Sequence, residues 1–578
     1  MEYKYWSDYT SLVELQKYGA NSLMMYALKL RFDIDDIDSV ASESITDGYE
    51  DKKCDLIYVD ESERIAIIAQ AYIKQNPQPN ERAKLTKAQD LNTAASWVLG
   101  RDIDDVPNLL KSAVVALRNA IDTGKITSLY FWYVHNCDEC NDIHNELDVV
   151  TTTAKAILNE FAPGINININ GFEIGNQTLE KWYSNTTSKI LVDKDIEIDL
   201  PYGGYEIKRA KWSAYQAYIS GKQLHELYGS YGDDLFSANP RRFLGTGKRT
   251  SAINLGIKNS AENESPNFWA YNNGVTALVH SYEYDEVDKL RIKGISIING
   301  AQTTGTIGTL ASPPDDLYIS MRVIKCIDQQ TIESIIANNN RQNEMIPSDY
   351  RSNDTYQTRL RDEFSKYPHL YYSGGLRSNL RPRNREVFHP DTVAQTLLAF
   401  SGNPVDAYDS IKEIWSNDTL YSQVFNDELE AEHVIFVYSL SKAIDDIKLE
   451  LQQKAKTVNF IDTEKKQLEF LSRRGSRILL LASLSNCLEN VLARTITSPR
   501  KLHFDDNSDF AACKSWWKPS IKAILSLYHA LVPALSAGGL DSKTKANDAM
   551  FTNRALLSAI IGPLTPEFED LRLHTKVN

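Results

Sequence analysis

The chain has 578 residues, a length that predicts three to four domains. Its formal net charge of -14 excludes a protein that coats nucleic acid through a generally basic surface, although a local basic groove would suffice for a nuclease. Six cysteines in so long a chain exclude a disulfide scaffold, and no apolar run approaches the ~18 residues that span a bilayer. Residues 1–6 lack the cationic start of a secretion signal, so we expect a cytoplasmic protein with no membrane partner.

The first part of the chain alternates helical and β-type patterns. Its predicted elements are a helix, two strands, a helix, a strand and a helix, at residues 9–32, 54–60, 65–73, 81–99, 128–134 and 145–161. The first two strands flank a short polar turn, which predicts a hairpin. Pro163 and Gly164 stop the last helix, so the pattern predicts a small α/β domain over residues 1–165.

The predicted hairpin carries a carboxylate and an amide, because Asp55 opens its first strand and Gln70 lies on its second. This arrangement resembles the restriction-endonuclease-like nucleases of the PD-(D/E)xK type. Those enzymes hold Mg²⁺ with an Asp on one strand and a Glu-x-Lys or Gln-x-Lys on the next. The chain departs from that pattern, because Tyr72 stands where the lysine is expected. Strand side chains alternate, so we expect Lys74 to share the face of Gln70 and to replace the missing charge.

Other carboxylates are available to complete a metal shell. The candidates are Glu14 on the first helix, or Asp47 and Asp51 just before the first strand. The resemblance implies Mg²⁺ held by Asp55 and Glu14, with catalysis by Asp55, Gln70 and Lys74. The alternative is a degenerate domain that keeps the fold and only binds.

The densest polar motifs lie further along, at residues 271–276 and 298–304. Each contains an Asn-Gly turn beside an apolar β-type run. Four amides exceed what a turn requires, namely Asn272, Asn273, Asn299 and Gln302. Amides both donate and accept hydrogen bonds, so they suit a neutral or phosphorylated ligand. A purely structural polar network is the alternative.

A third polar cassette follows at residues 335–343, and Arg322 lies within the strand-like run 319–324. The ordered set of motifs resembles the AIPR (abortive infection phage resistance) family over most of the chain. The residues that carry the resemblance are Phe268, Trp269, Asn272, Asn273, Gly274, residues 299–303, Arg322, Asn340, Gln342, Asn343 and Asp349, with residues 239–245 upstream. The resemblance implies a role in antiphage defence.

The polar motifs are expected to meet, because each of their segments ends an apolar run and strands can deliver such ends to one edge of a sheet. We therefore expect one cavity that binds a phosphate-bearing ligand through two arginines. Its predicted residues are Arg241, Asn272, Asn273, Asn299, Gln302, Arg322, Asn340 and Gln342.

The basic stretch at residues 377–385 is the best local candidate for contacts with nucleic acid. Arg377, Arg381 and Arg383 alternate there with amides, and guanidinium groups suit phosphates or stacked bases. A solvated basic loop is the alternative. From residue 389 onward helical stretches dominate, which predicts an all-helical domain over residues 389–578.

Residues 135–144 offer ligand types and spacing that suit zinc, at His135, Cys137, Cys140 and His144. The cysteines fall between a strand and a helix, where a polar loop is required anyway. No second Cys-x-x-Cys closes a four-ligand site, so we expect no zinc.

These patterns together predict a multidomain protein of the α/β and α+β classes. It would have a restriction-endonuclease-like domain (1–165), a mixed α/β AIPR core (166–388) and a helical C-terminal domain (389–578). We expect a defence protein that cleaves phosphodiester bonds in DNA or RNA with Mg²⁺, while its core senses a ligand such as a nucleotide. The alternative is a non-catalytic sensor or assembly subunit that binds a nucleotide, nucleic acid, or a phage or defence-system protein. A nucleotide-hydrolysing core is a third reading.

Overall fold

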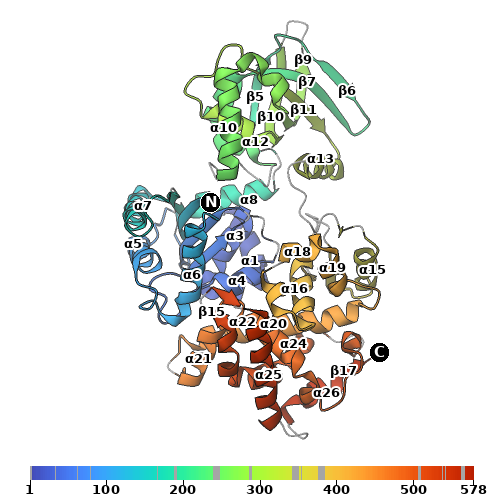
Figure 1. Cartoon of the computed structure of the whole chain (residues 1–578). Helices are drawn as coiled ribbons and strands as arrows, with labels where there is room; N and C mark the ends of the chain where they lie inside the picture. Colours follow the sequence, from blue (N-terminus) through green and yellow to red (C-terminus); the bar gives the residue numbers. More distant parts are fainter. Residues whose placement is uncertain are drawn as a thin grey trace.

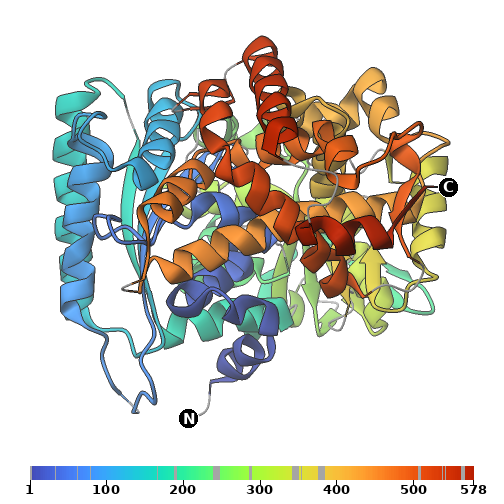
Figure 2. The same cartoon turned by 90° about the horizontal axis from the view of Figure 1, so that it is seen from below.

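The structure is a computed structural model that describes residues 3–577 except 33, 35, 62, 79, 166, 188–189, 191, 239–247, 285–288, 342–350, 353, 375–384, 410, 458, 506–508, 537, 541 and 561–565. Figure 1 shows an N-terminal part in blue, a mostly helical C-terminal part in orange and red beside it, and a central part in green above them. The view from below shows the C-terminal helices lying against the N-terminal part (Figure 2). The molecule is therefore a mixed α/β multidomain protein.

The N-terminal part is built on a four-stranded mixed sheet in the order β1-β2-β3-β4. The predicted hairpin is confirmed, because β1 (Leu56–Asp60) pairs antiparallel with β2 (Ile65–Tyr72). The other neighbours, β3 (Ser128–His135) and β4 (Asn168–Ile174), run parallel to β2. The apolar run of β2 is almost continuous because helices cover both of its faces.

Side chains along β2 point alternately to its two faces, so neighbouring residues pack against different helices. Ala66 and Ile68 face the cluster formed with α5 (Leu85–Ala95), α6 (Asn108–Asp122) and α7 (Asn141–Phe161). Ile67 and Ala69 face the opposite cluster, which includes α3 (Ser22–Phe32). Gln70 therefore belongs to the face covered by α5.

The observed elements of the N-terminal part differ from the predicted ones in three places. The helix expected at residues 9–32 is divided into α1 (Lys4–Ser11), α2 (Val13–Gln16) and α3, because Leu12 leaves the helical region and Gly19 adopts a φ of +56°. Helix α6 was not predicted. Strand β4 and helix α8 (Asn176–Thr187) lie beyond the expected boundary at residue 165, yet β4 completes this sheet and α8 contacts α1 through Tyr5.

The central part is a seven-stranded mixed sheet in the order β5-β10-β8-β11-β7-β6, with β9 paired to β10. Its strands are β5 (Val192–Asp199), β6 (Tyr205–Lys208), β7 (Trp212–Ser220), β8 (Val275–Val279), β9 (Ser281–Tyr284), β10 (Lys289–Asn299) and β11 (Tyr318–Cys326). One face is covered by α9 (Gly221–Tyr231), α10 (Lys248–Asn263) and α12 (Ala301–Gly308). The other face packs against α13 (Gln329–Arg341).

The C-terminal part surrounds α20 (Ala431–Lys454), a helix that is buried on most sides and lies at the centre of the largest core. Its other helices are α15 (Thr355–Phe364), α16 (Pro390–Phe400), α17 (Pro404–Asp409), α18 (Ile411–Ser416), α19 (Asp418–Val424), α21 (Asp462–Leu471), α22 (Ser476–Asn486), α23 (Leu488–Leu492), α24 (Phe510–Ser526), α25 (Lys543–Ile560) and α26 (Glu569–His574). Phe364 and Phe388 also enter this core, although both precede residue 389, where the C-terminal domain was expected to begin.

The expectation of an all-helical C-terminal domain was wrong in detail. Two two-stranded sheets lie within residues 389–578, β14 (Leu502–Phe504) with β17 (Thr575–Val577) and β15 (Leu535–Ser536) with β16 (Gly539–Leu540). A third, β12 (Leu370–Tyr372) with β13 (Glu386–Phe388), lies just before that range. Each strand has two or three residues, too few to produce a clear alternating pattern. Across the described residues, no helix is both long and apolar enough to cross a membrane.

Candidate metal centre

The hairpin places Asp55 and Gln70 side by side. The amide nitrogen of Asp55 donates to the carbonyl of Ala69 at 3.0 Å, next to the first paired residues of β1 and β2, Leu56 and Ala69. The carboxylate Oδ2 of Asp55 accepts from the amide nitrogen of Ala71 at 2.8 Å. Its Oδ1 lies 3.4 Å from Nε2 of Gln70. The two residues are therefore held together by backbone geometry as well as by their own side chains.

Two more carboxylates join Asp55 from the loop between α4 (Ile37–Ser44) and β1. One oxygen each of Asp47, Asp51 and Asp55 lies within 4.8 Å of the others, the one group in the described part of the chain with metal-ligand types at such spacing. The amide nitrogen of Thr46 donates to the Asp55 carbonyl at 3.0 Å, which ties this loop to the strand. Of the two ligand sets expected with Asp55, the structure brings together Asp47 and Asp51.

The side-chain oxygen of Gln70 is a second sign of a ligand. Gln70 is buried, and its Nε2 donates to the carbonyl of Lys53 at 2.8 Å. Its Oε1 is buried without a hydrogen-bond partner among the described residues. A buried polar atom without a partner costs about 1–3 kcal/mol unless something binds it. Carboxylate and amide oxygens are the ligands that Mg²⁺ prefers, so the residues present fit that ion.

The carboxyl group of Asp55 has a strongly perturbed affinity for protons. Burial, with a further contribution from Asp47, raises the pKa of Asp55 to about 7, although the amide of Ala71 and the charge of Lys87 oppose the rise. Burial also raises the pKa of Asp51. A buried group with a perturbed pKa beside like charges is typical of a functional site, because a cation would relieve both effects.

Lys74 and Glu14 lie elsewhere. Strand β2 ends at Tyr72, so the expected alternation does not extend to Lys74. The ammonium group of Lys74 pairs with the carboxylate of Glu81. Glu14 is exposed on α2, 4.0 Å from Lys29, and is not one of the three clustered carboxylates.

Lys87 is the cation that the sequence reasoning missed. It lies on α5, next to the buried Ala88, and its charge lowers the pKa of both Asp51 and Asp55. Helix α5 covers the face of β2 that carries Gln70. The sequence did contain one signal: Lys87 lies beside the buried residues of the helix that follows the hairpin. A motif defined on strands alone would not indicate this lysine.

The two Asn-Gly cassettes of the central part meet each other. Nδ2 of Asn272 donates to Oγ1 of Thr303 at 3.1 Å, and Oδ1 of Asn272 accepts from the amide nitrogen of Gly274 at 2.9 Å. Gly300 has a φ of +91°, and a Cβ there would lie 2.7 Å from the carbonyl oxygen of Gly274. Part of the polarity is therefore structural, although Oε1 of Gln302 is buried without a partner among the described residues.

Arg322 faces a groove between the central sheet and α13. Register pairs Arg322 with Thr276 on β8 and with Gln216 on β7, so the three side chains share the face that α13 covers. The groove has a volume of about 460 Å³. Its walls include Arg322, Gln216, Trp212, Ile335, Asn338 and Asn339. An exposed guanidinium, amides and apolar walls thus line one space.

Of the predicted ligand residues whose side chains the structure describes, only Arg322 lines this groove. Asn272, Asn273, Asn299 and Gln302 are not among its lining residues, whereas the neighbouring Asn338 and Asn339 are. Asn340 lies on α13, where only its backbone is described. Arg241, Gln342, Arg377, Arg381 and Arg383 lie outside the described residues.

One of the four residues considered for zinc, His135, has a carboxylate partner. Nε2 of His135 lies 3.1 Å from Oε1 of Glu173, and the amide nitrogen of Cys140 donates to the same carboxylate. Cys137 is buried.

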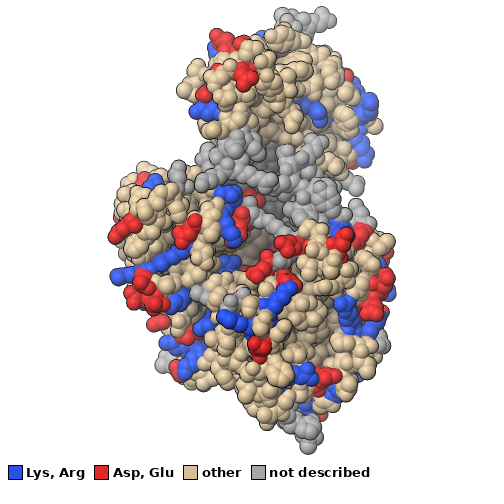
Figure 3. All heavy atoms as spheres, viewed as in Figure 1, with Lys and Arg blue, Asp and Glu red and all other residues tan. Residues whose placement is uncertain are grey.

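On the molecular face drawn in Figure 3, basic and acidic side chains are intermixed. The described residues of that face form no broad basic surface for nucleic acid.

The fold and the site together define a multidomain α/β protein whose N-terminal sheet carries an oxygen-lined acidic centre. Residues 236–506 match the AIPR protein family, so the chain contains an AIPR domain, and the match suggests a role in abortive-infection phage resistance. Comparisons with curated proteins and with solved structures found no match. The AIPR domain covers much of the central and C-terminal parts, whereas the acidic centre precedes it.

Proposed function

We propose that this protein acts in antiphage defence and that its N-terminal part is a metal-dependent nuclease for DNA or RNA. The AIPR domain supports the defence role. The observation that carries the nuclease is the cluster of three carboxylates beside the unpartnered Oε1 of Gln70.

In this proposal Asp47, Asp51, Asp55 and Oε1 of Gln70 hold Mg²⁺. A bound Mg²⁺ would activate the attacking water and stabilise the charge that develops on the phosphate. Asp55 presents its carboxylate in a fixed orientation, because Ala71 and Gln70 donate to its two oxygens. Lys87 takes the role expected of Lys74, since its charge favours the ionised forms of Asp51 and Asp55.

The test compares the purified wild-type protein with Asp55→Asn on panels of DNA and RNA, with Mg²⁺ or Mn²⁺ and with EDTA. We expect metal-dependent cleavage by the wild type and a loss of at least ~100-fold in Asp55→Asn. Asp60→Asn is the matched control, because Asp60 lies at the other end of β1. Equal cleavage by folded Asp55→Asn would refute the site, and equal protection from phage by that variant in cells would refute its role in defence.

The groove at Arg322 supports a second function, that of a ligand sensor in the central part. A guanidinium beside amides and the Trp212 ring suits a nucleotide, whose phosphate and flat base need both kinds of contact. We expect a nucleotide-dependent rise in melting temperature that Arg322→Ala abolishes. Arg291→Ala serves as the control, because Arg291 is an exposed arginine of the same sheet that pairs with Glu197. A rise that persists in Arg322→Ala would exclude the groove.

We also propose binding partners for this protein. Arg377, Arg381 and Arg383 are proposed to contact the nucleic-acid substrate. If the N-terminal part proves inactive, the alternative is a subunit that recognises a nucleotide, nucleic acid or phage protein and passes the signal to a defence partner.

A further inference from the structure

The loop that supplies two of the three carboxylates is held by the C-terminal part. We call residues 45–53 the acidic loop. Nζ of Lys456, just beyond α20, lies 2.7 Å from Oδ2 of Asp47. The same oxygen accepts from Nδ2 of Asn21 at 2.8 Å. Both donors thus fix one oxygen of Asp47, while its Oδ1 has no hydrogen bond to any described residue.

Tyr49, at the tip of the acidic loop, contacts three residues of the C-terminal part. Its hydroxyl donates to Oε1 of Glu469 at 3.4 Å, and its ring lies 6.1 Å from that of Phe460. The ammonium of Lys465 lies 4.9 Å from the centre of the Tyr49 ring. All three partners belong to α21 or the segment before it. An aromatic ring that contacts an apolar and a cationic partner restrains the loop without touching the carboxylates.

The backbone of the acidic loop needs such support. Lys52 and Lys53 adopt φ values of +52° and +66°, in the left-handed region that residues with a side chain disfavour. Two consecutive residues of this kind persist only where the surroundings fix them. The carbonyl of Lys53 receives the bond from Gln70, so this strained turn connects the loop to the acidic centre.

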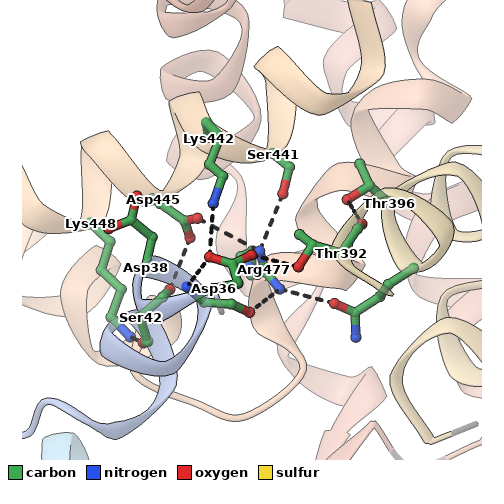
Figure 4. A network of polar contacts seen from close by, with 12 residues as sticks. Asp36, Asp38, Ser42, Thr392, Thr396, Ser441, Lys442, Asp445, Lys448 and Arg477 are labelled. Atoms are coloured by element: carbon green, nitrogen blue, oxygen red, sulfur yellow. Dashed lines mark hydrogen bonds and ion pairs between the residues drawn. The ribbon is translucent and has the colours of Figure 1, made fainter. Parts of the chain in front are cut away.

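The C-terminal part is fixed to the helix that leads into the loop. Nζ of Lys442 lies 3.3 Å from Oδ1 of Asp36, and Arg477 lies 3.6 Å from Asp445, which also accepts from Ser42 of α4 (Figure 4). These charges are mostly buried, so they depend on one another for compensation. The docked position of α20 and α22 therefore fixes α4 and, through α4, the start of the acidic loop.

We propose that the C-terminal part is a positioning element of the acidic centre: Tyr49 and its partners hold Asp47 and Asp51 in the arrangement that binds the metal ion. This inference rests on the metal site of the proposed nuclease. It makes metal affinity depend on a contact between two parts of the chain, through residues that touch neither metal nor substrate.

The test is a double-mutant cycle on Mn²⁺ affinity, with Tyr49→Ala on one side of the contact and Phe460→Ala on the other. We expect each variant to bind Mn²⁺ about five- to tenfold more weakly, the factor that the loss of one ring contact predicts. The double variant should lose little more than Tyr49→Ala alone, because Tyr49→Ala already removes the ring contact that Phe460→Ala removes. Tyr49→Phe keeps the ring and should bind within about twofold of the wild type.

Hydrogen exchange of residues 46–53 is the second measurement, and Tyr49→Ala is expected to accelerate it. Wild-type affinity in both single variants, or unchanged exchange in Tyr49→Ala, would overturn the positioning role and leave the metal site standing. If the wild type itself bound no Mn²⁺, the metal site and this inference would both fall. Activity assays are not needed for either measurement.

Discussion

Asp55→Asn should stabilise the N-terminal part in the absence of metal, and the gain should grow with pH. The change replaces a buried carboxyl group with an amide of the same shape. The pKa of Asp55 is about 7 in the folded protein against an ordinary value of 3.8. At about 1.36 kcal/mol for each unit of pKa, ionising this group in place costs the fold about 4 kcal/mol.

The sign follows from the raised pKa. The folded protein retains the proton of Asp55 more strongly than the unfolded chain does. The stability that this protonated carboxyl group contributes is therefore fully present below pH 4 and is lost as pH rises towards 7. The wild-type protein should therefore be less stable than Asp55→Asn by about 4 kcal/mol at pH 8 but only about 2 kcal/mol at pH 5. The amide has no proton to lose, so this contribution is absent from the variant.

Hydrogen exchange of the β1 and β2 amides in EDTA measures this difference locally, which matters because a multidomain chain does not unfold in one step. Added Mn²⁺ should reverse the order, because only the wild type gains binding energy. A gap between the two proteins that stays constant from pH 5 to pH 8, or one that shrinks as pH rises, would refute the reasoning.

Three further predictions follow from the described contacts. Mn²⁺ affinity, measured by calorimetry, should rise about tenfold for each pH unit up to about pH 7 and then level off, because Asp55 must lose its proton to bind; a flat profile would exclude Asp55 as a ligand. Lys87→Met should move that plateau to higher pH, since Lys87 lowers the pKa of Asp55, whereas Lys74→Met, which loses only the pair with Glu81, should leave it in place. Thr303→Val should destabilise the central part by about 1 kcal/mol in thermal melting, because Asn272 loses its partner, and an unchanged melting temperature would show that this bond contributes nothing.

The sequence was sufficient to predict the part of the site that depends on local geometry. Asp55 and Gln70 meet because a hairpin fixes which residues oppose each other, and the strand pattern gave that register. Lys74 was expected on the same face, but β2 ends before it, and strand ends are poorly defined by periodicity.

The remaining contributors depend on tertiary packing that no local pattern encodes. Lys87 reaches the carboxylates only because α5 lies across the hairpin face, and Tyr49 meets Phe460 only because two distant parts dock. The same holds in the central part, where the sequence identified the two polar Asn-Gly cassettes. Their mutual bond through Asn272 and Thr303, and the groove beneath α13, follow from the strand order of the sheet.

The distance along the chain between the docked partners has a consequence for synthesis. Asp36 and Lys442 are separated by 406 residues, so the ribosome completes the N-terminal sheet long before the segment that clamps the acidic loop emerges. At roughly 5–20 residues per second, translation from Asp36 to Lys442 takes about 20–80 s. If the contacts of Tyr49 set metal affinity, nascent and prematurely terminated chains would carry a weak metal site. Only the full-length chain would bind the metal ion tightly. If the N-terminal part is the nuclease proposed above, the order of translation would thus protect the cell from fragments of the chain.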